Sequence, residues 1–378
     1  MLHCKEDYSM KKAIAYLLSA LLLYAASGCA SESREKTSSQ TDVVSDTETT
    51  DAPSPEATAV TAAAALSPAL EEAIQAHNLE GVVYAVQDGT AVASYAKGKT
   101  ENGSDITLDT PLPLGSVSKQ FCAAAVLLLQ DQGKLSVNDT LDKFYPDYAE
   151  GKRLTLHNLL SMRSGIPELT EESRAAVSPD KSEAENVAAI KQWVFSQPLL
   201  SDPDKEFVYT NINYFLLADI VEQASGKPYA EFLRESFFTP LGMTHTGSVS
   251  ELAGSPARAQ GNTYEKVESA PGLTKGAGDL IANAADVTAW INALSGGKAI
   301  SAEGYRAMTT DYSPDTHYGY GLYLNLHGGV GHYGAIQIYS AFDYVNTDKK
   351  LTLVALSNSI DPTLMTGVAD DLLTALLP

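Results

Sequence analysis

The 378-residue chain has only three cysteines and carries 26 basic side chains against 47 acidic ones. Three cysteines (Cys4, Cys29 and Cys122) cannot form a disulfide framework, and their spacing matches no metal site. The net charge of −21 would repel phosphate backbones, which excludes nucleic-acid binding through a basic face. No run of 18 or more apolar residues follows residue 30, so we expect no membrane-spanning helix in the body of the protein. We therefore expect no metal, no cofactor and no nucleic-acid partner.

The N-terminus has the features of a secretory signal. Met10-Lys11-Lys12 precedes a mostly apolar run from Ala13 to Ala25, and small residues follow. Ala26-Ser27-Gly28-Cys29 resembles the lipobox of bacterial lipoproteins, with Ala26 where a branched aliphatic residue is most common. The alternative, a buried core helix, is disfavoured because a strongly polar segment follows at once. We expect residues 1–29 to be a signal peptide and Cys29 to carry lipid, which would tether the protein in the cell envelope.

The segment from residue 30 to residue 66 has the composition of a flexible tether. It is rich in Ser, Thr, Ala, Asp and Glu, contains no aromatic residue, and has seven acidic side chains against two basic ones. Such a segment cannot bury enough apolar surface to offset the entropy lost on ordering. We expect a disordered acidic linker that leads to a single folded body at residues 67–378.

Predicted strands lie near both ends of this body, and predicted helices lie between them. Two β-rich runs, 81–87 and 90–97, flank Asp88-Gly89, which is a two-residue hairpin signal. A second pair is predicted at 332–345 and 350–357. The clearest helices are 70–77 after Ser67-Pro68, 121–132, 155–161, 213–225, 284–294, and a last one capped by Asp361-Pro362. This order predicts an α+β fold: an antiparallel sheet built from N- and C-terminal strands, flanked by helices, with an inserted all-helical lobe.

One of six S-x-x-K motifs stands in a context suited to nucleophilic catalysis. The chain contains neither the G-x-S-x-G elbow nor H-E-x-x-H. Only Ser116 opens a long apolar helix, on which Lys119 follows one turn later on the same face. A lysine there can accept the serine proton if burial lowers its pKa. Taken alone, the motif is better explained as a helix cap. The six motifs begin at Ser9, Ser33, Ser94, Ser116, Ser178 and Ser295.

Two further motifs supply groups that such a lysine needs. Tyr209-Thr210-Asn211 precedes a predicted helix and offers a hydroxyl for proton sharing and an amide for a substrate carbonyl. Gly331-His332-Tyr333-Gly334-Ala335 opens a β-rich run. Each motif alone is also compatible with a structural role, because both patterns recur. Y-x-N also begins at Tyr323 and Tyr344, and H-x-G also begins at His245, His317 and His327.

In this order the three motifs resemble those of the serine β-lactamase and penicillin-binding protein superfamily, most closely its class C-like branch of β-lactamase-related serine hydrolases. The resemblance extends over residues 67–378 and implies the β-lactamase/transpeptidase-like fold. Other matching segments are Gly133-Lys134-Leu135-Ser136, Leu154 to Ser161, Ser164-Gly165-Ile166, Pro240-Leu241-Gly242-Met243, Ala277-Gly278-Asp279-Leu280 and Tyr318-Gly319-Tyr320-Gly321-Leu322.

The resemblance implies a catalytic role for five side chains: Ser116, Lys119, Tyr209, Asn211 and His332. Ser116 would be the acylated nucleophile, and Lys119 would activate it. Tyr209 would share the proton with Lys119, and Asn211 would orient Lys119 and the substrate carbonyl. Which of these groups is the general base stays open, as it does in better-known branches of the superfamily.

The resemblance also assigns roles to the strand motif. His332 would line the cleft beside Tyr209. The pKa of an unperturbed histidine side chain is about 6.5. Gly334 would let substrate approach the strand, and the backbone N–H of Ala335 would join that of Ser116 in an oxyanion hole. Tyr333 and Ile338 replace smaller residues of relatives, so we expect a narrower cleft.

These roles imply an envelope serine hydrolase that acts through an acyl-enzyme on Ser116. Its activity would be D-Ala-D-Ala carboxypeptidase-like or β-lactamase-like. The alternatives are a promiscuous carboxylesterase of the same fold and a non-catalytic member that binds or senses peptidoglycan. The expected partners are a small-molecule or peptidoglycan-derived substrate and, through the lipid anchor, a membrane. The sequence leaves the oligomeric state open.

Overall fold

The computed structural model describes residues 65–100, 103–248, 270–336, 339–358 and 364–377. The expected signal peptide, Cys29 and nearly all of the acidic linker lie outside these ranges. Within them, no helix combines the length and apolar character needed to cross a membrane. The same ranges contain no group of three His, Cys, Asp or Glu side chains that is arranged to hold a metal ion.

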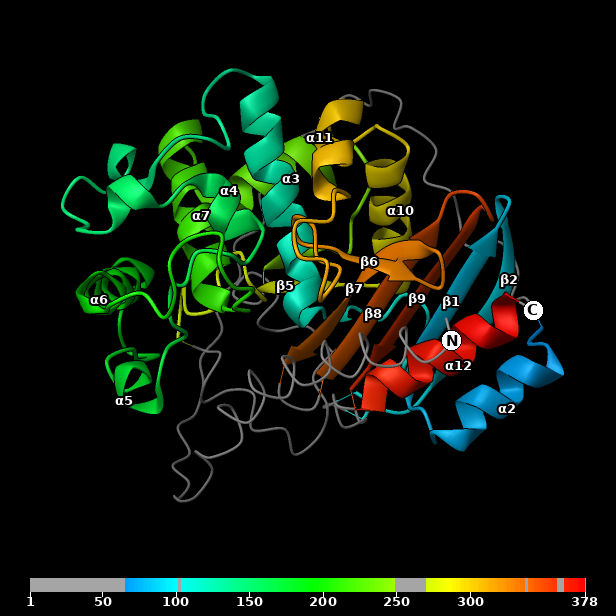
Figure 1. Cartoon of the computed structure of the whole chain (residues 1–378). Helices are drawn as coiled ribbons and strands as arrows, with labels where there is room; N and C mark the ends of the chain where they lie inside the picture. The colour runs from blue at the N-terminus through cyan, green and yellow to red at the C-terminus, as the bar shows by residue number, and fades with distance from the viewer. Residues whose placement is uncertain (1–64, 101–102, 249–269, 337–338, 359–363, 378) are drawn as a thin grey trace, which may run out of the picture.

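A six-stranded antiparallel sheet forms the centre of the molecule, in the order β2-β1-β9-β8-β7-β6 (Figure 1). The first strand of the body, β1, pairs with the last one, β9, with Gly81 opposite Ser357, so the prediction of a sheet built from both ends of the chain is confirmed. The strands are β1 (Gly81–Gln87), β2 (Thr90–Lys97), β6 (Tyr323–Leu326), β7 (Gly329–Ile336), β8 (Tyr339–Asn346) and β9 (Leu351–Ser357).

Helices cover both faces of this sheet. The terminal helices α2 (Pro68–Ala76) and α12 (Met365–Leu376) lie side by side on one face, and α10 (Ala284–Ser295) packs against β8 and β9 on the other (Figure 1). Alternation along β8 explains the two layers, because successive side chains of a strand point to opposite faces. Asp343 binds Gln120 on the α10 side, whereas Phe342 stacks on Tyr333.

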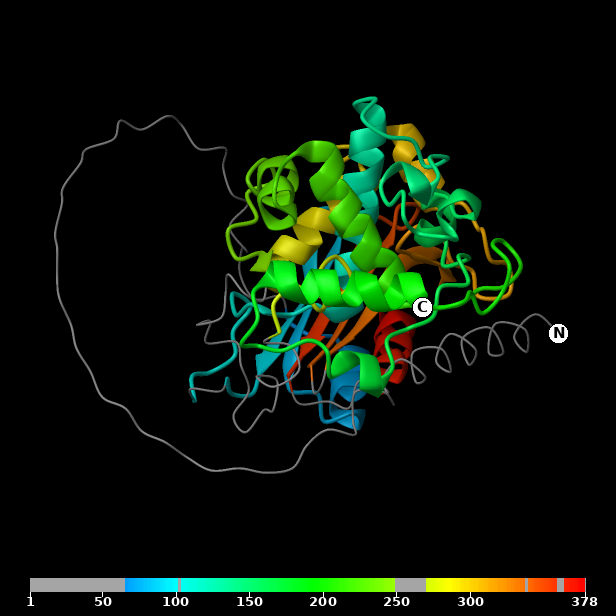
Figure 2. The ribbon, with the colours of Figure 1, turned by 90° about the vertical axis from the view of Figure 1, so that its left-hand side faces the viewer.

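The inserted lobe lies beside the sheet and contains most of the remaining helices (Figure 2). They are α3 (Ser118–Asp131), α4 (Leu156–Leu160), α5 (Glu171–Arg174), α6 (Glu183–Ser196), α7 (Asn211–Ser225), α8 (Tyr229–Leu233) and α11 (Ala302–Met308). Local signals fix several of their ends. Thr155 and Asn158 form a capping box that starts α4, and Gly226, at φ +75°, ends α7.

Three details differ from the sequence-based expectation. The short strands β3 (Leu112–Pro113), β4 (Gly247–Ser248) and β5 (Leu280–Ala282) were not predicted and form a second sheet in the order β3-β5-β4. The run predicted at 332–345 is two strands, β7 and β8, which pair with each other as a hairpin. The predicted cap Asp361-Pro362 lies outside the described residues.

Candidate active site

Ser116 lies on a single 3₁₀ turn, Gly115–Val117, directly before α3. Gly115 has a φ of +49°, and a Cβ atom on it would stand 2.7 Å from the backbone nitrogen of Ala335. Only glycine fits this position, since both the positive φ and the close contact exclude a side chain. The turn is thereby pressed against β7, and it holds Ser116 partly exposed above the buried Lys119.

Lys119 is completely buried and donates to three oxygens. Its Nζ lies 2.9 Å from Ser116 Oγ, 2.8 Å from Asn211 Oδ1 and 2.8 Å from the carbonyl oxygen of Ala277. Burial lowers the pKa of Lys119 to about 7, although the negative charge of Glu168 opposes the shift. The two carbonyl-type oxygens can only accept, so in the neutral amine they hold both N–H groups. The nitrogen lone pair then faces the hydroxyl of Ser116.

Tyr209 and Asn211 reach this cluster from the N-terminus of α7. Thr210 between them is the helix cap, and its Oγ1 accepts the backbone N–H of Ile212 at 3.2 Å. The Tyr209 ring centre lies 5.0 Å from Lys119 Nζ. Its hydroxyl approaches Ser116 without completing a hydrogen bond within the described part of the chain. Burial raises the pKa of Tyr209 more strongly than Ser116 lowers it, so Tyr209 stays a protonated donor at neutral pH.

His332 lies beside Tyr209, with 6.4 Å between the ring centres, but it is buried instead of lining an open cleft. The side chain is fully buried, with Nδ1 2.5 Å from the carbonyl oxygen of Tyr333 and Nε2 3.1 Å from the hydroxyl of Tyr318. A carbonyl can only accept, so Nδ1 carries the proton and Nε2 accepts from Tyr318. Burial and the charge of Lys119 lower the pKa of His332 to about 3. The expectation of a histidine that titrates near neutral pH is therefore corrected: this imidazole stays neutral.

The neighbours of His332 on β7 also require a correction. A Cβ atom on Gly334 would stand 1.9 Å from the carbonyl oxygen of Leu114. The absence of a side chain therefore makes room for the turn that carries Ser116, and not for a substrate. Tyr333, expected to narrow the cleft, is buried and stacks on Phe342 at 4.8 Å between ring centres. Ala335 does lie beside the serine turn, as the oxyanion-hole assignment requires. Ile338 is outside the described residues.

The sequence analysis missed two carboxyl groups near this cluster, Asp343, which is buried, and Glu168, which is partly buried. Gln120 Nε2 donates to both carboxylate oxygens of Asp343, at 2.7 Å to Oδ1 and 2.8 Å to Oδ2. The Oδ1 atom also accepts the backbone N–H of His332 at 2.9 Å. Burial raises the pKa of Asp343 to about 7. Glu168 accepts the backbone N–H of Asn211 at 2.6 Å. Neither residue belongs to a motif, and each contacts groups far away in the sequence, so no local pattern indicated them.

The geometry thus brings Ser116, Lys119, Tyr209 and Asn211 together and keeps His332 behind them. Comparison with known proteins identifies the family of the chain. The family described as Beta-lactamase matches residues 66–375. PbpX of Bacillus subtilis (strain 168), named for penicillin binding, is 30% identical over 307 residues, which cover 79% of this chain and 75% of PbpX.

Two more proteins are similar over most of the body. A D-aminopeptidase of Brucella anthropi is 28% identical over 296 residues, which cover 74% of this chain but only 56% of that enzyme. The solved structure of an octameric penicillin-binding protein homologue from Pyrococcus abyssi superposes with a TM-score of 0.69 at 26% identity, covering 82% of this chain and 76% of that one. This chain belongs to the β-lactamase family and is a serine hydrolase with the β-lactamase and penicillin-binding protein fold.

Proposed function

We propose that Ser116 is acylated by a small amide or ester and that Lys119 is the general base. One observation carries this proposal: Lys119 directs its third hydrogen-bonding position at Ser116 Oγ while Asn211 and Ala277 occupy the other two. A base is most effective when its pKa lies near the working pH, and burial places that of Lys119 at about 7. Tyr209, as a protonated phenol, is the better donor.

The chemistry divides into two steps. Ser116 Oγ bonds to the substrate carbonyl carbon, Lys119 takes the hydroxyl proton, and the backbone N–H groups of Ser116 and Ala335 stabilise the oxyanion. The bond from carbon to the leaving nitrogen or oxygen then breaks, and the leaving group takes up the proton that Lys119 accepted, relayed through the Tyr209 hydroxyl, so Lys119 is neutral again. A water molecule then attacks the ester carbonyl and gives a proton to Lys119. The Oγ–carbon bond breaks, the acid leaves, and Lys119 returns the proton to Ser116 Oγ.

For the substrate class, we propose that an amide or ester without a terminal carboxylate is preferred. The position where a histidine of ordinary pKa was considered holds a neutral imidazole, both of whose ring nitrogens are already bonded to protein groups. His332 therefore offers no positive charge and no free donor to a substrate carboxylate. The similarity to a D-aminopeptidase supports an amide substrate of this kind. D-Ala-D-Ala carboxypeptidase and β-lactamase activities are the second candidates, supported by the similarity to PbpX.

A hydrolysis panel on the folded body tests this preference. It contains p-nitrophenyl butyrate, D-alanine p-nitroanilide, a diacyl-Lys-D-Ala-D-Ala peptide and nitrocefin. We expect kcat/KM for the first two to exceed that for the carboxylate-bearing pair by about tenfold or more, since unpaired buried charge is costly to bind. Rates of Ser116→Ala are subtracted as background. Faster turnover of the peptide or nitrocefin would reverse the substrate assignment.

We also propose that the mature protein is anchored in the cell envelope through Cys29. The lipobox-like Ala26-Ser27-Gly28-Cys29 and the acidic linker behind it support this. One acyl chain binds membranes only marginally, so stable anchoring needs more than one chain on the processed cysteine. We expect the Cys29→Ser variant to move from the membrane fraction to the soluble fraction. Membrane retention equal to that of the wild type would contradict the anchor.

A further inference from the structure

Glu168 links the loop after Ser164-Gly165-Ile166 to the N-terminus of α7. Its Oε2 accepts the backbone N–H of Asn211 at 2.6 Å and the hydroxyl of Thr210 at 3.4 Å. Its Oε1 accepts the backbone N–H of Leu169 at 2.9 Å. The side chain is only 16% exposed, so these contacts are shielded from water. We propose that Glu168 is a positioning residue that fixes Tyr209-Thr210-Asn211 and holds a negative charge beside Lys119. This inference rests on the proposed function.

The positioning effect passes through one residue. Glu168 holds the backbone of Asn211, and the side chain of Asn211 holds Lys119 at 2.8 Å from Nζ. Thr210 caps α7 through the N–H of Ile212, whereas Glu168 takes the N–H of Asn211, the residue whose side chain contacts Lys119. Tyr209 precedes the held residues directly, so a shift of this segment moves both the proposed proton donor and the group that orients the base.

The electrostatic effect concerns the charges around Lys119. The negative charge of Glu168 is the largest influence that raises the Lys119 pKa against burial. From α3, Cys122 contributes little charge, because burial raises its thiol pKa far above neutrality. From α7 and β7, Tyr214 and His332 are neutral, since burial raises the pKa of the phenol and lowers that of the imidazole.

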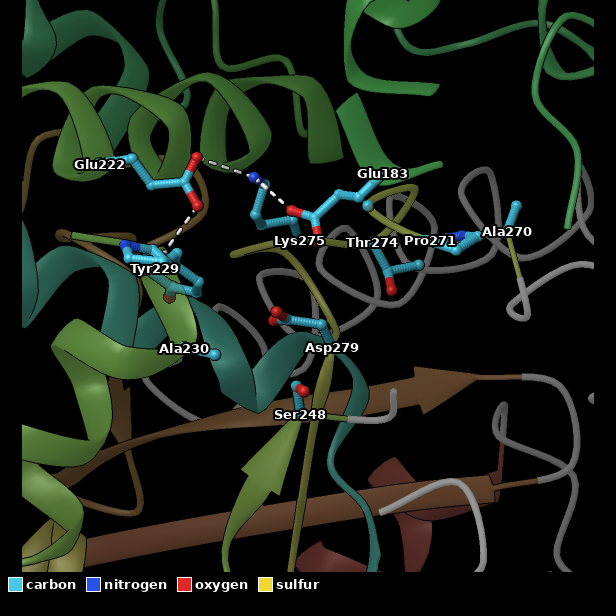
Figure 3. Close-up of a pocket in the computed structure, with 12 residues that line it drawn as sticks. Glu183, Glu222, Tyr229, Ala230, Ser248, Ala270, Pro271, Thr274, Lys275 and Asp279 are labelled. Carbon is cyan, nitrogen blue, oxygen red and sulfur yellow. Dashed lines mark hydrogen bonds and ion pairs between the residues drawn. The ribbon is translucent and has the colours of Figure 1, made fainter. Parts of the chain in front are cut away.

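A second carboxyl group that acts on Lys119 precedes β5. Asp279 lines a pocket together with Lys275, which forms ion pairs with Glu183 at 2.6 Å and Glu222 at 2.9 Å (Figure 3). Burial raises the pKa of Asp279 to about 7, so it carries only part of a charge when Lys119 titrates. Glu168 itself faces one cation, Arg174, whose Nη2 lies 3.5 Å from its Oε1. Glu168 is thus the principal carboxylate acting on Lys119 within the described residues.

Two substitutions separate these effects. Glu168→Gln removes the negative charge but keeps an oxygen that can accept the Asn211 N–H. Glu168→Asp keeps the charge, but its shorter side chain moves the carboxylate oxygen away from that N–H. The probe is a fluorophosphonate: the bond from Ser116 Oγ to phosphorus forms, the P–F bond breaks, fluoride leaves, and Lys119 takes the serine proton. Its rate as a function of pH reports the base directly and requires no knowledge of the natural substrate.

We expect the labelling rate of the wild type to rise with pH and to level off at a plateau. The midpoint of the rising limb of this pH–rate curve should lie near the Lys119 pKa of about 7. In Glu168→Gln the limb should move about one unit toward lower pH, because losing a nearby negative charge lowers a lysine pKa further. In Glu168→Asp the limb should stay in place while the plateau rate falls about tenfold, since the base loses its alignment. Glu172→Gln, an exposed carboxylate on α5, is the matched control and should leave limb and plateau unchanged.

The outcomes distinguish this inference from the proposed function. A wild-type protein that is not labelled at Ser116 overturns the proposed function and the inference with it. If the wild type is labelled and Glu168→Gln shows the same pH dependence of labelling, the inference is overturned and the proposed function stands. Should Glu168→Gln fail to fold, Glu168→Asp decides, because an undiminished plateau in that variant removes the positioning role.

Discussion

Ser116→Ala is expected to abolish labelling by fluorophosphonate and to lower turnover of any substrate by about four orders of magnitude or more, because the covalent route is lost. The fold should tolerate the change. Ser116 is partly exposed on its turn, and its hydroxyl bonds only to Lys119 among the hydrogen bonds of the described residues. Intact-mass measurement after labelling, together with a thermal melt, gives both readouts on one sample. An inactive protein with an unchanged melt would also exclude a purely structural role for the serine.

Two other S-x-x-K serines provide matched controls for this experiment. Ser94 lies within β2, where Lys97 three residues later points to the opposite face. Ser178 lies in a loop, and Lys181 bonds to the carbonyl oxygen of Ala176 at 2.6 Å instead of to the serine. Ser94→Ala and Ser178→Ala should therefore keep full labelling. Loss of labelling in either of them, with Ser116→Ala still labelled, would move the nucleophile elsewhere.

Local signals in the sequence were sufficient for the hairpin and for several helices. Asp88-Gly89 predicts a tight turn, and both residues have positive φ, +48° and +77°, as the favoured two-residue hairpin turn requires. Ser67-Pro68 predicts the start of α2, where Ser67 Oγ accepts the Leu70 N–H at 3.3 Å. In each case the residues that carry the signal are neighbours in the chain, so tertiary contacts were not needed to interpret them.

Elements that depend on distant partners were not predictable in this way. The strands β3, β4 and β5 have two or three residues each and exist only because the fold brings them together.

The helix α6 was not predicted, although its sequence carries a local signal. Ser182 and Glu185 form a capping box at its start.

The same distinction applies to the active site. The spacing of Ser116 and Lys119 on one helical turn was visible in the sequence, and the 2.9 Å contact agrees with it. The burial of His332 was not visible, because it depends on the Tyr318 hydroxyl and on a backbone carbonyl that meet it only in the folded chain. The pKa of a motif residue is therefore set by surroundings that the motif does not contain.

Gly334→Ala is expected to be a strongly disruptive single-methyl change near the site. A Cβ atom at this position would stand 1.9 Å from the carbonyl oxygen of Leu114 and 3.3 Å from Ala341 Cβ. The first contact is with backbone, so β7 and the turn that carries Ser116 must move apart. We expect a loss of about 1–3 kcal/mol in the free energy of unfolding, the range typical of overpacked positions.

The same displacement should also lower the labelling rate, by about a hundredfold, because it separates the backbone N–H groups of Ala335 and Ser116 that we assign to the oxyanion hole. Gly367→Ala provides the control: this glycine lies inside α12, the nearest atom to an added Cβ is His77 Cε1 at 3.5 Å, and the label site is on the other side of the sheet. That variant should gain about 0.5–1 kcal/mol from helix propensity and label at the wild-type rate. Wild-type stability and labelling in Gly334→Ala would show that β7 does not depend on this close approach, and the oxyanion-hole assignment of Ala335 would lose its structural basis.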